Sequence, residues 1–328
     1  MTTAPPPSSA PLHVVLGAGQ IGPLVARRLL DHGLRVRLVR RGRFGVEVPA
    51  GAETATADVG DPASAAEVMR GAAVVYHCVN PAYTEWHDRL LPLTRSIVGG
   101  ATRAGAHLVV LDNLYMYGRA PGGVMREDTP VAPCSKKGAL RATAAAEMIA
   151  ARDRGDLALT IGRASDFIGP GSTLAAAFGD RFWPRAFAGK PGEVLGDPDQ
   201  PHAYTYVPDV ADALVTLGTD HRARNRLWLL PTNPAEPTRA MFARVGRALG
   251  VELGATAIPT WLLRGLGVVS PMMREIAEMT YQWQAPFIVD DAAYRTTFGR
   301  AATPWDVAIP ATVAWARAHY AAPARQAA

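Results

Sequence analysis

Short apolar runs alternate with longer segments of helical periodicity through the first half of the chain. Runs typical of buried strands lie at residues 12–19, 35–39, 72–79, 107–112 and 157–163. Segments of helix length lie between them, at residues 23–32, 63–71, 86–104 and 133–154. This alternation predicts a parallel sheet with helices on both faces, joined by right-handed crossovers.

The pattern changes after Asp166. Glycine, proline and aromatic residues crowd residues 169–205, and the alternation stops. A helix is predicted at residues 206–218, a further strand at 226–231, and two or three helices from Thr238 onward. We therefore expect a nucleotide-binding domain at residues 12–168 plus 206–232, and a smaller, mostly helical substrate lobe at residues 169–205 plus 233–328.

Residues 1–11 differ in composition from the rest of the chain. They contain four prolines and no charged side chain. A stretch with so little to bury predicts a disordered leader. The stretch also lacks the basic start and apolar middle of a secretory signal.

A glycine-rich turn follows the first predicted strand and opens the first predicted helix. Its residues are Gly17, Ala18, Gly19, Gln20, Ile21 and Gly22. In a dinucleotide site the first glycine makes the tight turn, the second lets the backbone approach a pyrophosphate, and the third allows close helix packing. The helix N-terminus adds positive potential. The motif predicts a Rossmann-type doubly wound α/β fold that binds a dinucleotide; the alternative is a glycine-rich turn without a ligand.

The end of the second predicted strand indicates which cofactor is used. NAD-binding units usually place a carboxylate there to hold the ribose hydroxyls, whereas this chain has Arg40, Arg41 and Arg43. Arginine suits bidentate contact with a 2′-phosphate, which a carboxylate would repel. We expect NADP(H) in preference to NAD(H); the alternative is that these arginines are exposed charge. Asp58 is a candidate adenine contact, or else a turn residue or helix cap.

Several further segments match a known family in their order along the chain. They are Leu111-Asp112-Asn113 before Tyr117-Gly118, the run Arg163–Gly171, and the run Tyr206–Ala211. With the glycine turn and Asp58, they make the chain from Leu12 onward resemble the extended short-chain dehydrogenase/reductase family, the NAD-dependent epimerase/dehydratase group. The resemblance implies a Rossmann-type fold and a nicotinamide cofactor.

The family's catalytic pattern is not kept. Typical members place a Ser or Thr five residues before the glycine of the Tyr-Gly pair, where this chain has Asn113. They then carry Tyr-x-x-x-Lys, with a Glu four residues beyond the Lys. If Glu147 is that acid, Ala139 and Thr143 occupy the Tyr and Lys positions, and neither can move a proton.

Other residues are candidates for the missing chemistry. Tyr115, two residues beyond Asn113, could donate a proton while Asn113 hydrogen-bonds the substrate oxygen; the alternative is a packing tyrosine. Lys137 could replace the missing lysine, or be a solvated lysine at the helix start. Asp166 is a further catalytic candidate, because it lies near the carboxyl end of a predicted strand, where ligands bind in open α/β sheets. The alternative is that it caps the next turn.

The remaining site candidates are polar and aromatic residues near strand ends. Asn80 is expected beside the cofactor, and Tyr83 and Trp86 could wall the nicotinamide pocket. His202 and Tyr204 are candidates for substrate contact, although a lone histidine is more often structural. No HxxxH or paired CxxC spacing occurs, so no metal site is expected.

Composition and charge exclude several classes of function. Of 328 residues, 48% are hydrophobic and 19% charged, which allows a sizeable core. No run approaches 18 apolar residues, so no membrane span is expected, and two cysteines fit a reducing cytosol. The net charge is +5, but the arginines are scattered, so nucleic-acid binding is not expected. The absence of Gly-x-Ser-x-Gly argues against a serine hydrolase of that type.

These observations favour a cytoplasmic NADP(H)-dependent oxidoreductase that transfers a hydride to or from a small organic substrate. The reacting group would be a carbonyl, an imine or an activated alkene. Loss of Tyr-x-x-x-Lys also suits two alternatives, a non-catalytic NADP(H)-binding redox sensor and a non-redox isomerase or cyclase.

The two long helices near residues 86–104 and 134–152 suggest a mode of assembly. Family members often dimerise through these helices, and small side chains permit close approach. The second helix carries Ala139, Ala142, Ala144, Ala145 and Ala146. We expect a homodimer; the alternative is that these alanines pack on the chain's own sheet.

Overall fold

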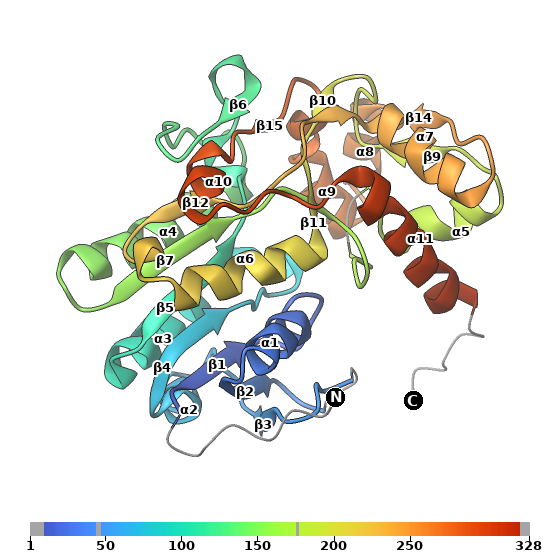
Figure 1. The fold of residues 1–328 in the computed structure, drawn as a ribbon. Coiled ribbons are helices and arrows are strands. Elements are labelled where there is room, and N and C mark those ends of the chain that lie inside the picture. The colour runs from blue at the N-terminus through green and yellow to red at the C-terminus, as the bar shows by residue number, and fades with distance from the viewer. Residues whose placement is uncertain (1–9, 44–46, 175–176, 322–328) are drawn as a thin grey trace. The chain divides into compact units, whose positions relative to one another are not determined.

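The computed structural model describes residues 10–43, 47–174 and 177–321. These residues form two compact units (Figure 1). Unit 1 comprises the described parts of residues 1–116, together with 136–163 and 210–230. Unit 2 comprises 117–135, the described parts of 164–209, and 231–321. Apart from residues 10 and 11, the predicted disordered leader lies outside the described residues.

Unit 1 is built on a parallel sheet of seven strands, which confirms the predicted fold class. The strands are β1 (Leu12–Leu16), β2 (Arg35–Arg40), β3 (Glu53–Thr56), β4 (Ala72–His77), β5 (His107–Asp112), β7 (Ala158–Arg163) and β12 (Leu227–Leu229). Their order is β12-β7-β5-β4-β1-β2-β3. Strand order therefore reverses between β1 and β4, and open α/β sheets bind ligands beyond the carboxyl ends of strands at such a point.

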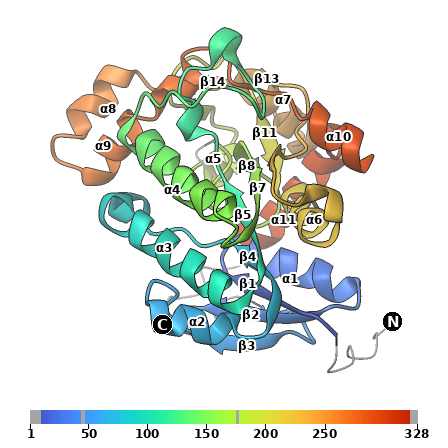
Figure 2. The ribbon, with the colours of Figure 1, turned by 90° about the vertical axis from the view of Figure 1, so that its left-hand side faces the viewer.

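Helices cover both faces of this sheet. They are α1 (Gly22–Asp31), α2 (Pro62–Met69), α3 (Trp86–Ala104), α4 (Lys136–Asp153) and α6 (Val207–Thr219). Figure 2 shows α3 and α4 on one face, with α1 and α6 on the other. Arg28 of α1 pairs with Asp212 of α6 at 2.7 Å, which ties the second pair of helices together. The predicted helix at 133–154 begins three residues later than expected.

The core of unit 1 lies between the sheet and the helices α2, α3 and α4. Strand residues Val14, Leu16 and Leu108 are fully buried there and pack with Met69 of α2 and Ile97 of α3. Hydrophobic burial of this extent stabilises the sheet. The polar residues at the carboxyl ends of the strands are not part of this apolar core and can form a site.

Unit 2 combines paired short strands with short helices. The strand pairs are β10 (Pro201–His202) with β13 (Glu236–Pro237), β11 (Tyr204–Tyr206) with β8 (Asp166–Ile168), β14 (Ala255–Ala257) with β9 (Gly192–Val194), and β15 (Ile288–Val289) with β6 (Val124–Met125). The helices are α5 (Phe182–Phe187), α7 (Thr238–Leu249), α8 (Thr260–Leu266), α9 (Pro271–Ala277), α10 (Ala292–Phe298) and α11 (Trp305–Ala321).

The helical content after Thr238 was underestimated from the sequence. Two or three helices were expected, whereas the described residues there form five α-helices. The segment 260–277 is split because Gly267 ends α8 and Pro271 begins α9. Proline fits the first turn of a helix, where its missing N–H costs nothing. None of the described helices is long and apolar enough to span a bilayer.

The observed units and the predicted domains divide the chain at different places. Residues 117–135 belong to unit 2, although the sequence interpretation assigned them to the nucleotide-binding domain. The first boundary falls at Arg163 rather than at residue 168. The strand β8 explains this, because it pairs with β11 in a separate small sheet instead of extending β7.

Candidate functional site

The glycine turn lies in unit 1 between the carboxyl ends of β2 and β4. The Gly17 N–H donates to the Val39 carbonyl at 2.9 Å, and the Cys78 N–H donates to the Leu16 carbonyl at 3.0 Å. These backbone hydrogen bonds fix the turn at the point where strand order reverses. The turn therefore has the location that a dinucleotide pyrophosphate requires.

Two of the three glycines are needed for packing, and the other is not. Gly17 has φ of 104°, and a Cβ there would lie 2.9 Å from the Cys78 carbonyl oxygen. A Cβ at Gly22 would lie 1.7 Å from the Gly17 carbonyl oxygen, so the helix could not approach the turn. A Cβ at Gly19, by contrast, would meet nothing within 4 Å. Gly19 thus borders open space, as expected of the glycine that a ligand approaches.

The N-terminus of α1 carries no side chain that neutralises it. Its N-cap residue is Ile21, which makes no side-chain cap hydrogen bond, and the first turn holds no acidic residue. Leu24 and Val25 donate their N–H groups to the Ile21 carbonyl. Gln20 is partly buried beside it. The positive end of the helix dipole is therefore available to an anion.

The three arginines after β2 occupy different environments. Arg40 is partly buried, and its Nη1 atom is buried without a hydrogen-bond acceptor among the described residues. Arg41 and Arg43 are exposed. Arg41 lies 3.9 Å from the Asp58 carboxylate, so that acid partly neutralises the cluster. Because a buried donor without an acceptor is unfavourable, Arg40 is the member of this cluster that an additional acceptor would stabilise.

Asp58 is a turn residue in this structure. Its Oδ1 accepts from the Gly60 N–H at 2.9 Å, whereas the N-cap of α2 is Asp61, which accepts from the Ser64 N–H at 2.8 Å. The helix-cap alternative for Asp58 is therefore wrong. Its predicted contact with adenine stays a prediction.

A buried polar cluster lies at the carboxyl ends of β4, β5 and β7. Asp112, the last residue of β5, lies 3.5 Å from the Arg141 guanidinium of α4 and accepts a 3.2 Å hydrogen bond from Arg163 of β7. Arg141 also donates to the side-chain oxygen of Asn80, which follows β4. Asp112, Arg141 and Arg163 are each at most 6% exposed. Burial lowers the pKa of the Arg141 guanidinium, and the Asp112 charge acts in the opposite direction.

Aromatic rings complete the cluster: Trp86 begins α3, Tyr83 lies in the turn before it, and Tyr115 lies in the turn after β5. The Arg141 guanidinium lies 4.3 Å from the centre of the Trp86 ring, and the Lys137 ammonium lies 4.3 Å from the centre of the Tyr83 ring. Tyr83 and Trp86 meet edge to face at 5.2 Å, and Tyr115 lies 6.1 Å from Trp86. Both cations therefore gain cation–π attraction in a desolvated setting.

The structure corrects the sequence interpretation of α4. Ala139 and Thr143, which were assigned the Tyr and Lys positions, are exposed. Glu147, which set that register, pairs with Arg95 of α3 through two hydrogen bonds of 2.6 and 2.9 Å. Lys137 and Arg141 occupy the buried face instead, with the spacing of Tyr-x-x-x-Lys. Lys137 is 3% exposed, so its interpretation as a solvated lysine is wrong.

Arg141 is the residue that sequence reasoning missed. A signal was present, since Arg141 follows Lys137 by one helical turn and therefore shares its face. A helix with alanines on several sides gave no clear apolar stripe from which to fix that face.

Asn113 and Tyr115 lie beside this cluster. The Asn113 side-chain oxygen accepts from the Tyr115 N–H at 3.1 Å, which shapes the turn after β5. Both residues are partly exposed. The charge of Arg141 interacts with the Tyr115 and Tyr83 phenols. The predicted catalytic residues Tyr115, Asn113 and Lys137 are thus gathered with Asn80, Tyr83 and Trp86 within unit 1.

The titratable groups of His77, the last residue of β4, and of Cys78, which follows it, are neutral at physiological pH. Burial, assisted by the Arg141 charge, lowers the pKa of His77 to about 3. Its Nδ1 accepts from the Val79 N–H at 3.3 Å, which suits the neutral ring. Burial raises the pKa of the Cys78 thiol to about 12. Neither group supplies charge to the site.

The remaining predicted residues belong to unit 2. His202 lies 2.7 Å from the Asp166 carboxylate and 3.2 Å from the Gln282 carbonyl oxygen. Its ring stacks between Trp283 and Phe287, at 4.8 and 5.0 Å.

Tyr204 shares this core position. It is buried, and its hydroxyl is 2.7 Å from that of Thr238. These contacts make His202 and Tyr204 buried residues of unit 2, and their predicted contact with substrate stays a prediction. Asp166 holds the buried histidine; its catalytic assignment stays a prediction.

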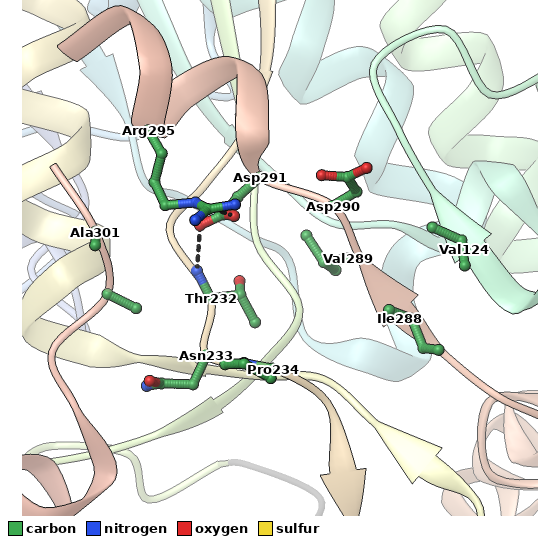
Figure 3. A pocket seen from close by; sticks show the side chains of 11 residues that line it. Val124, Thr232, Asn233, Pro234, Ile288, Val289, Asp290, Asp291, Arg295 and Ala301 are labelled. Carbon is green, nitrogen blue, oxygen red and sulfur yellow. Dashed lines mark hydrogen bonds and ion pairs between the residues drawn. The ribbon is translucent and has the colours of Figure 1, made fainter. Parts of the chain in front are cut away.

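Unit 2 also contains a pocket of about 350 Å³, drawn in Figure 3. Asp291 lies at one side, where it accepts from the Thr232 N–H at 3.1 Å and pairs with Arg295 at 3.0 Å. Asp290 pairs with Arg126 at 2.8 Å. The two carboxylates that line the pocket are thus paired with groups of the same chain. Among the described residues, no group of three or more metal-ligating side chains occurs here or elsewhere.

Comparison with known proteins agrees with this geometry. The chain belongs to the NAD dependent epimerase/dehydratase family, whose model matches residues 13–227. This confirms the resemblance drawn from the sequence. The match covers the glycine turn, the helix α4 and the sheet as far as the first residue of β12, and most of the matched residues belong to unit 1.

Individual relatives are distant. A dTDP-6-deoxy-L-talose 4-dehydrogenase (NAD(P)(+)) of Kitasatospora kifunensis is 24% identical over 78% of this chain and 85% of its own. An epimerase of Methanothermobacter thermautotrophicus has a TM-score of 0.78 at 13% identity, over 95% of this chain and 94% of that one. A UDP-glucuronic acid 4-epimerase of Bacillus cereus, solved with NAD, has a TM-score of 0.76 at 15% identity, over 96% and 99%. These structural likenesses show the fold.

Proposed function

We propose that this protein is an NADP(H)-dependent oxidoreductase that transfers a hydride to or from a small organic substrate. The observation that carries the proposal is the glycine turn. Gly17 and Gly22 allow close packing, Gly19 borders open space, and the N-terminus of α1 lacks an acidic cap. These features fit a dinucleotide pyrophosphate.

In this proposal the residues around the turn would hold the cofactor. The backbone at Gly19, Gln20 and Ile21 would bind the pyrophosphate, and Arg40, whose Nη1 has no acceptor among the described residues, would bind the 2′-phosphate. The bound nicotinamide supplies the hydride chemistry, and the protein supplies orientation and a proton.

The polar cluster would handle the substrate. Tyr115 would exchange a proton with the reacting oxygen or nitrogen, since its phenol borders the Arg141 cation and lies beside Trp86. Asn113 would fix the turn that carries Tyr115. Tyr83 and Trp86 would exclude water from one side. Lys137 is the alternative proton donor, because it is the first member of a buried pair on α4 that has the spacing of Tyr-x-x-x-Lys.

The names of the relatives suggest which substrates to test first. They act on dTDP- and UDP-linked sugars according to those names. We propose nucleotide-linked keto sugars and their alcohols as the first class. The test measures oxidation or reduction of the cofactor in the presence of each compound. Near-ultraviolet absorbance monitors the reaction.

A specific observation favours a second candidate, a protein that binds the cofactor without turnover. The buried face of α4 holds two cations, Lys137 and Arg141, at the spacing of the family's Tyr-x-x-x-Lys pair, and no phenol stands at either position. Tight binding of NADPH without its consumption by any compound would favour this candidate.

A further inference from the structure

We propose that Arg141 is the positioning residue of the cofactor site, acting through Asn80. In this role it replaces the lysine of the family's Tyr-x-x-x-Lys pair by clamping the ends of β4 and β5 together. The inference rests on the proposed function, because it assumes that a dinucleotide binds at the glycine turn.

The first argument is the direct line of contacts from Arg141 to that turn. The guanidinium donates to Asn80, which directly follows Val79. A Cβ at Gly17 would lie 3.1 Å from the Val79 side chain and 2.9 Å from the Cys78 oxygen. The segment that Arg141 holds is thus the one that forms a wall of the glycine turn.

The second argument is that Arg141 joins two neighbouring strands. Its Nη1 lies 3.5 Å from Asp112 at the end of β5, and its Nη2 bonds Asn80 after β4. These strands pair in the sheet from Val74 with His107 to His77 with Val110. A planar guanidinium holds two acceptors in fixed directions while its flat face stacks on Trp86, whereas an ammonium group has three donors but no flat face to stack.

The third argument is an unused donor. The Nε atom of Arg141 is buried and has no acceptor among the described residues. A buried donor without a partner costs free energy, so an acceptor at this position would stabilise the cluster. A ligand that opens onto the cluster could supply the missing acceptor.

The experiment measures the dissociation constants of NADPH and NADH by cofactor fluorescence for the wild type, Arg141→Met, Asn80→Ala and the double variant. Arg141→Met should weaken the binding of both cofactors by about tenfold to hundredfold, the loss expected for a charge-assisted hydrogen bond. Asn80→Ala should weaken binding as well. The double variant should bind no more weakly than Arg141→Met, since residues that act through each other are not additive.

Two further variants keep the test decisive. Arg95→Met breaks an exposed ion pair between the same two helices and should leave both constants unchanged. If Arg141→Met does not fold, as judged by thermal melting, Arg141→Lys keeps a charge near Asp112 and replaces it in the cycle; it too should weaken binding and not add to Asn80→Ala.

The outcomes separate this inference from the proposed function. A wild type that binds neither cofactor would refute the proposed function itself. A wild type that binds, with a folded Arg141 variant of equal affinity, would overturn the role of Arg141 alone. Strictly additive losses in the double variant would also overturn it, because Arg141 would then not act through Asn80.

Discussion

The Arg141 guanidinium lies 4.3 Å from the centre of the Trp86 ring, and the Lys137 ammonium lies 5.6 Å from the same ring. Lys137 and Arg141 are one helical turn apart, so α4 presents two cations to one aromatic surface. The family pattern has a phenol and a lysine at this spacing. Lys137 and Arg141 thus share the spacing of that pair, with two cations on the buried face of α4.

Gly19→Ala should weaken cofactor binding without affecting the fold. A methyl group at Gly19 meets nothing within 4 Å in the structure, but it would enter the space proposed for the pyrophosphate. Titration with NADPH should show at least a tenfold loss of affinity, about 1.4 kcal/mol. Gly99→Ala on α3, which also meets nothing within 4 Å, is the matched control. Equal affinity in Gly19→Ala and wild type would remove the pyrophosphate from this turn.

Arg40→Ala should reduce the preference for NADPH over NADH. The wild type should bind NADPH more tightly, because a 2′-phosphate can accept from the buried Nη1 of Arg40 and from Arg41 and Arg43. The substitution should bring the ratio of the NADH and NADPH dissociation constants closer to one, mainly because NADPH binds more weakly. Tighter NADH binding by the wild type, or an unchanged ratio in Arg40→Ala, would contradict this assignment.

Acid should destabilise unit 1 through its buried histidines. Burial lowers the pKa of His77 to about 3, and the pKa values of His13 and His107 to about 4, from 6.5. Below about pH 6.5 these histidines bind protons in the unfolded chain but stay neutral in the folded chain. The free energy of unfolding therefore decreases as the pH falls below that value. Linkage gives about 2 kcal/mol per histidine at pH 5.

Thermal melting between pH 7.5 and pH 5 measures this effect. His77→Gln should flatten the dependence of the melting temperature on pH, because it removes one of the three groups. His87→Gln on the exposed side of α3 removes a histidine that is not buried and serves as the control. A pH dependence that is the same in wild type and His77→Gln would show that His77 is not responsible.

The chain should form a homodimer through α3 and α4. Ala139 and Ala146 are exposed on α4 and could meet a second copy, whereas Ala144 and Ala145 are buried in the chain's own core. Light scattering at micromolar concentration should give about twice the chain mass of 34.8 kDa. A mass near that of one chain would refute the prediction, and Ala146→Arg should dissociate a dimer that uses this face.

The strand pattern and the glycine turn could be predicted from sequence because they depend on neighbouring residues. The apolar run that becomes β1 and the turn from Gly17 to Gly22 carry their own local signals. The face of α4 could not be predicted in this way. Glu147 suggested a register, but its partner Arg95 lies on α3, and a pairing across 52 residues leaves no local trace.

The burial of His202 was hidden for the same reason. Its ring is enclosed by Trp283 and Phe287, about eighty residues further along the chain. Its neighbours in sequence, Ala203 and Tyr204, give no sign of that enclosure. Long-range contacts thus decided which of the polar candidates lie in a core and which lie at the strand ends.

The most direct test of the proposed oxidoreductase is turnover by wild type and Tyr115→Phe with NADPH and a panel of nucleotide-linked keto sugars. We predict loss of reduced-cofactor absorbance in step with formation of the alcohol, and a kcat lowered by about 10²–10⁴-fold in Tyr115→Phe with NADPH affinity unchanged. If Tyr115→Phe keeps full turnover while Lys137→Ala abolishes it, the proton donor is Lys137. Tight cofactor binding without any turnover, neither NADPH oxidised by the keto sugars nor NADP+ reduced by the corresponding alcohols, would contradict the account.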